Sequence, residues 1–180
     1  VISALIFLLV NLFLKLKKKD RSYEYIGFKL VCFVYTLMVI RYVFLPIPFN
    51  GLAVSNMREM VGPFTIESTY LMSIIPIFGI FYSHSLLSFL LNIILFIPYG
   101  ILSKVGDNAR SLKSLVIRGF CISLLIEITQ LSLNLLWNIN YRSFDFNDMI
   151  ANTVGTAFGI LIYVIINNLY SKKYEGESIY

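Results

Sequence analysis

The chain has 180 residues, of which 58% are hydrophobic and only 14% are charged, and its mean hydropathy is +0.78. A soluble domain carries about 25% charged residues, so this composition excludes an ordinary water-soluble domain and predicts an integral membrane protein. The two cysteines, Cys32 and Cys121, both lie in apolar stretches, which excludes a disulfide scaffold and a CxxC metal site. The chain has 15 Lys and Arg and 10 Asp and Glu, which gives a net charge of +5. The meaning of this charge depends on where the basic residues lie.

A helix needs roughly 20 apolar residues to cross a bilayer, and five runs are candidates. In chain order they cover residues 1–14, 26–49, 86–102, 115–137 and 148–167. The first run is short and its basic residues follow it, whereas a signal peptide carries its positive charge in front; we interpret it as a truncated first helix. The run 71–82 has only 12 residues and contains Pro76 and Gly79, which favours a re-entrant or interfacial segment over a span.

The basic residues predict the orientation of these spans. With five spans, ten Lys and Arg in 15–25, 103–113 and the C-terminal tail fall on one side, and Arg58 and Arg142 fall on the other. Because cytoplasmic loops are rich in Lys and Arg, we expect an outside N-terminus, a cytoplasmic C-terminus, and outward-facing connections at 50–85 and 138–147. Topology thus accounts for the basic residues, and we expect no nucleic-acid partner.

The predicted fold is therefore all-α, a polytopic membrane bundle of about five transmembrane helices with a short re-entrant or interfacial segment on the outer side. We divide it into a truncated first helix with a basic cytoplasmic loop at 1–25, a membrane domain at 26–167 and a cytoplasmic tail at 168–180.

Polar side chains inside the spans are functional candidates because they are costly in a bilayer. At a rise of 1.5 Å per residue, Glu127 lies about 15 Å and Gln130 about 10 Å below the outer end of their span at Trp137, and Arg41 and Asn92 lie about 8 and 9 Å deep. All candidates fall between the bilayer centre and the outer face, so we predict one outward-opening ligand site. Its members are Arg41, Asn92, Glu127, Gln130, Arg142, Asp145, Asp148 and Asn152.

Each candidate also has a structural interpretation. Asn92 and Gln130 are amides that could simply hydrogen-bond helices to one another. Glu127 could be a protonated packing group, and Asp148 could cap the N-terminus of the last helix. The lone His84 and the missing HExxH, P-loop and GxGxxG motifs give no reason to expect a metal or a cofactor. Gly155 and Gly159 form a GxxxG pattern that predicts close helix packing.

Three stretches resemble the VanZ-like family of bacterial membrane proteins. They are NIILFIPYG at 92–100, SLLIEITQ at 123–130 and RSFDFNDMIANTVGTAFG at 142–159, and they match N-x-x-x-F-x-P-x-G, I-E-x-x-Q and R-x-x-D-x-x-D-x-x-x-N-x-x-G-x-x-x-G in order. Seven of the eight candidates fall on these patterns, and Arg41 rests on its depth. The resemblance covers about residues 30–165 and leaves 50–85 without a counterpart. It implies a plasma-membrane protein of a family whose founding member confers low-level resistance to teicoplanin, a lipid-bearing glycopeptide antibiotic.

Two main functions follow as hypotheses. The first is a non-enzymatic envelope protein, embedded in the lipid bilayer, whose polar site engages a lipid-linked cell-wall precursor or the lipoglycopeptide; its arginines would meet anionic groups and its carboxylates would hold them. The alternative is an intramembrane enzyme acting on a lipid-linked precursor with Glu127 and Asp148 as an acid–base pair. A transporter with Glu127 as a proton relay is a third. The oligomeric state stays open.

Overall fold

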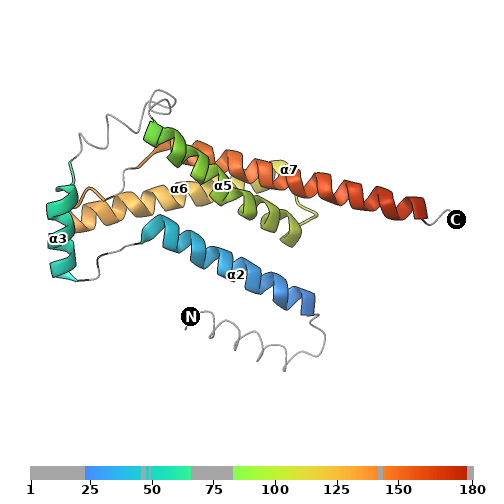
Figure 1. Cartoon of the computed structure of the whole chain (residues 1–180), viewed down its shortest axis with the longest axis horizontal. Helices are drawn as coiled ribbons and strands as arrows, with labels where there is room; N and C mark the ends of the chain where they lie inside the picture. Colours follow the sequence, from blue (N-terminus) through green and yellow to red (C-terminus); the bar gives the residue numbers. More distant parts are fainter. Residues whose placement is uncertain (1–22, 46–47, 49, 66–82, 142–143, 178–180) are drawn as a thin grey trace. The chain divides into compact units, whose positions relative to one another are not determined.

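A computed structural model describes residues 23–45, 48, 50–65, 83–141 and 144–177, and every element in these ranges is a helix (Figure 1). The helices are α2 (Tyr23–Phe44), α3 (Gly51–Val61), α5 (Ser83–Gly106), α6 (Leu112–Trp137) and α7 (Phe146–Glu177). The predicted all-α class is confirmed. The chain forms two compact units, Val1–Ile47 with α2 and Pro48–Tyr180 with the other four helices.

Four helices are long and apolar enough to cross a membrane, and they confirm four of the five predicted spans. These segments are Tyr25–Phe44, Leu86–Gly106, Leu112–Trp137 and Phe146–Leu169. The predicted span at 1–14 and the segment at 71–82 lie outside the described residues. Helix α3 falls in the stretch 50–85, where no helix was predicted at its position, and its 11 residues are too few to cross a bilayer.

Helix α6 shows how the membrane-spanning helices are built. Its buried residues recur three or four positions apart and are mostly small or polar: Leu115, Gly119, Ser123, Glu127, Gln130 and Asn134. The opposite face exposes Leu125 (62%), Ile128 (46%) and Leu136 (78%). A broad apolar face of this kind is tolerated in lipid and not in water, so α6 turns its polar side toward the protein and its apolar side toward the bilayer.

Helices α5 and α7 run parallel and pack closely through glycines. A Cβ atom at Gly155 would collide with the carbonyl oxygen of Ile93, and one at Gly159 would collide with that of Ile97. On α5, a Cβ at Gly100 would meet the Thr156 carbonyl. The predicted packing role of the GxxxG pattern is confirmed, because backbones this close leave no room for a side chain.

Helix α6 runs antiparallel to α7, as the order of its contacts shows. Gly119 of α6 leaves room for the Thr156 side chain of α7. Ser123, four residues later on α6, is hydrogen-bonded to Asn152, which lies four residues earlier on α7. The turn between α5 and α6 is held by Lys104, whose buried Nζ donates to the carbonyls of Asn108 (2.6 Å) and Arg110 (3.1 Å). Lys104 thus stabilises the loop besides adding to its positive charge.

Candidate functional site

The centre of the candidate site is a polar contact between α6 and α7. Asn152 Nδ2 donates to Ser123 Oγ at 2.8 Å, and Thr156 Oγ1 donates to the Asn152 carbonyl at 2.9 Å. All three side chains are buried. Hydrogen bonds between helices hold polar groups in an apolar bundle, so this part of the site has a clear structural role.

Glu127 links the middle of α6 to the start of α7. Its side chain is 1% exposed, and Oε2 accepts a hydrogen bond from the backbone N–H of Asp145 at 2.9 Å. Asp145 is the N-terminal cap of α7. Its side-chain Oδ1 accepts a hydrogen bond from the backbone N–H of Asn147 at 2.8 Å, and its carbonyl accepts one from the backbone N–H of Met149. The carboxylate of Glu127 therefore fixes where α7 begins.

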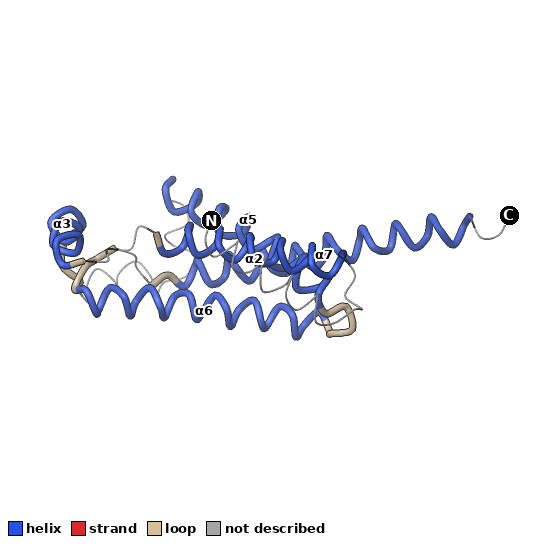
Figure 2. Tube along the Cα trace, turned by 90° about the horizontal axis from the view of Figure 1, so that it is seen from below, coloured by secondary structure: helices blue, strands red, loops and turns tan. Residues whose placement is uncertain are grey.

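This bond corrects the depths expected from the sequence. Asp145 was expected in the outer loop, with Glu127 about 15 Å deeper. The structure places the backbone of Asp145 against Glu127, although α6 continues for another ten residues to Trp137. The chain after α6 therefore turns back, and α7 starts beside the middle of α6 and not at its end (Figure 1). Figure 2 shows the helices from a second direction.

Backbone groups at the start of this returning connection are hydrogen-bonded to α6 and to residues in and next to α3. Ile139 N–H donates to the Asn134 carbonyl, and Asn140 N–H donates to the Gly62 carbonyl at 3.0 Å. Arg58 of α3 donates through Nη2 to the Trp137 carbonyl at 2.6 Å and through Nε to the Asn138 carbonyl at 2.9 Å. A cation at a helix C-terminus is favourable, so α3 stabilises the end of α6.

The structure brings five of the eight predicted site residues to one end of the α6–α7 interface. Glu127, Gln130 and Asn152 are buried there, Asp145 caps α7, and Asp148 is half-buried in its first turn. Asn92 is half-buried on α5, next to the contact between Ile93 and Gly155.

Neither of the two predicted arginines belongs to the described part of this group. Arg41 is exposed in the last turn of α2, which belongs to the other unit. Arg142 lies outside the described residues. Their part in the site stays a prediction.

Sequence reasoning missed four residues that build the site. Ser123 and Asn134 extend the line of Glu127 and Gln130 by four residues in each direction, so the helical period could have found them. Thr156 follows Asn152 by four residues and offered the same signal. Arg58 offered none, because its partners are backbone carbonyls some 80 positions later.

Two electrostatic features distinguish the site. Asn152 Oδ1 is buried without a hydrogen-bond partner among the described residues, which costs about 1–3 kcal/mol and favours a small donor there. Burial raises the pKa of the Asp145 carboxyl above 3.8, against the opposing effect of its hydrogen bonds with Asn147. Within the described residues, no group of three or more His, Cys, Asp or Glu could hold a metal ion.

Comparison with known proteins identifies a family for most of this chain. A family model described as VanZ/LLP1 matches residues 31–167, a range that includes all eight predicted site residues. No curated protein and no solved structure matches significantly.

Proposed function

The chain belongs to the VanZ/LLP1 family, and we propose that it is a non-enzymatic multi-pass protein of the bacterial plasma membrane that binds a lipid-linked or lipid-bearing ligand at its α6–α7 polar site. The observation that carries this proposal is the bond from Asp145 N–H to the buried Glu127 carboxylate. It holds a polar connection at the depth of the middle of a membrane-spanning helix, where the polar head of a lipid-anchored ligand could reach it.

In this proposal each group of site residues has its own role in binding the ligand. Glu127 positions the connection that carries Arg142 and Asp145 through its acceptor oxygen, and its negative charge holds the arginine of that connection, which meets anionic groups of the ligand, as arginines do well. Asn92, Gln130 and Asn152 supply neutral hydrogen bonds, and Asn152 Oδ1 is an acceptor that a ligand or a water could use.

A positioning role for Glu127 is better supported than the acid–base role of the alternative enzyme. A general acid or base must exchange its proton with the substrate, whereas the Oε2 atom of Glu127 already accepts a backbone N–H. We therefore favour binding over catalysis.

The ligand that we propose is teicoplanin or the lipid-linked precursor that such drugs recognise. Protection would arise because less of the drug reaches the outer surface of the plasma membrane. The test is the minimum inhibitory concentration of teicoplanin, beside that of vancomycin, which lacks the lipid tail, in a susceptible host. The host would express wild type, Glu127→Gln or Glu59→Gln at matched levels. Glu59 is the control because it is an exposed carboxylate on α3.

We expect wild type and Glu59→Gln to raise the inhibitory concentration of teicoplanin but not that of vancomycin, and Glu127→Gln to lose the effect. Full protection by a well-expressed Glu127→Gln protein would overturn the proposed role of the site. No protection by wild type would overturn the proposed ligand while leaving the family and the fold as they are.

A further inference from the structure

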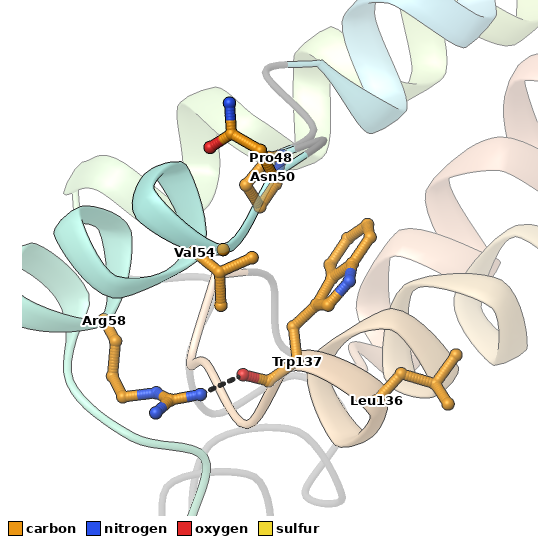
Figure 3. Close-up of a pocket in the computed structure, with 7 residues that line it drawn as sticks. Pro48, Asn50, Val54, Arg58, Leu136 and Trp137 are labelled. Atoms are coloured by element: carbon orange, nitrogen blue, oxygen red, sulfur yellow. Dashed lines mark hydrogen bonds between the residues drawn. The ribbon is translucent and has the colours of Figure 1, made fainter.

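A groove of about 450 Å³ lies between α3 and the last turn of α6 (Figure 3). Val54 of α3 and Leu136 and Trp137 of α6 form apolar walls, and among the described residues that line the groove only Arg58 is charged. The groove differs from the α6–α7 polar site, since none of the eight predicted site residues lines it. It is open on one side and makes room for a ligand at the end of a membrane-spanning helix.

Arg58 gives this groove a positive charge and free donors. A guanidinium has five N–H donors, and the bonds to the carbonyls of Trp137 and Asn138 use two of them. Those bonds also fix the side chain, so the remaining donors are held in place at little further entropic cost. A guanidinium that is held in place with unused N–H donors is well suited to bind a phosphate group.

The apolar side of the groove continues the lipid-facing side of α6. Leu125, Ile128 and Leu136 follow one another along the exposed face of the helix, away from its buried polar line. Trp137 is the next residue, and tryptophan favours the level of the lipid headgroups. An acyl chain lying along this face would therefore lead its headgroup into the groove, next to Arg58.

We propose that the groove binds an anionic membrane lipid, with its headgroup phosphate at Arg58 and its acyl chain along Leu136. The occupant is a lipid and not a free phosphate ion, because the apolar wall is continuous with the surface that the bilayer covers. The same lipid would support α3 against α6. This site is independent of the ligand proposed for Glu127.

Trp137 makes the proposal measurable, since it is the only tryptophan in the chain. The full chain would be placed in nanodiscs of neutral lipid that contain a small fraction of either brominated phosphatidylglycerol or brominated phosphatidylcholine, whose bromines quench a nearby indole. We expect apparent association with the anionic lipid to be about fivefold stronger, the scale of one basic residue at an anionic surface. Equal quenching by the two lipids would overturn the proposal.

Variants assign the preference to Arg58. Arg58→Gln should abolish the preference for the anionic lipid, and Arg58→Lys should keep part of it. Arg118→Gln should leave the preference unchanged, because Arg118 is an exposed arginine near the other end of α6, where it pairs with Asp107. A preference that survives in Arg58→Gln would contradict the proposal.

Two measurements on wild type guard against local unfolding in the Arg58→Gln variant. High salt should weaken the preference because it screens an exposed phosphate–guanidinium pair, and a preference insensitive to salt would count against Arg58. Inorganic phosphate at millimolar concentration should not displace the brominated lipid; if it does, the occupant is a free anion and the lipid assignment is wrong.

Discussion

Glu127 combines two properties that a single substitution can separate. Its carboxylate is negative, and its Oε2 atom accepts the N–H that positions the start of α7. Alanine removes both properties, whereas glutamine keeps an acceptor oxygen of the same reach. Stability and function should therefore respond differently to the two changes.

We expect Glu127→Ala to lower the free energy of unfolding by about 1–3 kcal/mol, because the partly buried N–H of Asp145 is left without an acceptor, and Glu127→Gln to lower it by clearly less. Thermal unfolding in detergent or nanodiscs, followed by circular dichroism, would measure the difference. Equal destabilisation by both variants would show that the charge, and not the acceptor, holds Asp145.

Asp145 makes a prediction about pH. Burial raises its pKa in the folded protein above the value of 3.8, so the folded state binds the proton more tightly than the unfolded state does. Its contribution to stability is complete below pH 3.8 and is lost as the pH rises through the raised pKa.

Asp145→Asn removes this titration but keeps an oxygen that can accept the Asn147 N–H. We expect the melting temperature of the variant, relative to wild type, to rise as the pH is raised from about 4 to about 7. Melting curves of both proteins across this range would test it. A difference that stays constant with pH would contradict the predicted direction.

The residues of the candidate site could be predicted from the sequence better than their depths. Glu127 and Gln130 were recognisable because a carboxylate and an amide stand three positions apart in an apolar run. The level of Asp145 could not be predicted, because it depends on where the chain folds back after α6. That fold depends on bonds such as Asn140 to Gly62 and Arg58 to Trp137, which join residues far apart in sequence and have no local pattern.

At the scale of the helices, length and hydropathy predicted α2, α5, α6 and α7 because each is long and apolar. Helix α3 was missed for the opposite reason. It has 11 residues and a mixed composition, GLAVSNMREMV, so its position depends on the capping of α6 by Arg58 and not on a periodic apolar face.

The packing of α5 against α7 yields a prediction for these elements. Gly159→Ala should destabilise the bundle by about 1–3 kcal/mol, since the new methyl group would collide with the carbonyl oxygen of Ile97 and force the two backbones apart. Gly27→Ala is the matched control, because a Cβ atom there meets nothing within 4 Å; alanine is also the better helix former.

Thermal unfolding of the two glycine variants in the same lipid would test this packing. We expect a lower melting temperature for Gly159→Ala and an unchanged or higher one for Gly27→Ala. If Gly159→Ala were as stable as wild type, the close contact with Ile97 would not be essential to the bundle.

At the scale of the whole molecule, the remaining prediction is orientation. Lys104 in the last turn of α5 and Arg110 in the turn that follows lie at one end of α6, while α3 lies at the other end, where Arg58 bonds the Trp137 carbonyl. The two ends of α6 should therefore face opposite sides of the membrane. Cytoplasmic loops attract Lys and Arg, so we expect the turn in the cytoplasm and α3 outside.

Single cysteines at exposed positions would decide this orientation. Asn108→Cys reports on the turn and Asn56→Cys on α3, in a background where Cys32 and Cys121 have been replaced. A membrane-impermeant maleimide should label Asn56→Cys in intact cells and Asn108→Cys only after the membrane is opened. The reverse pattern would turn the polar α6–α7 site toward the cytoplasm, where an extracellular glycopeptide could not reach it, and would exclude teicoplanin as the ligand while leaving the packing of the helices unchanged.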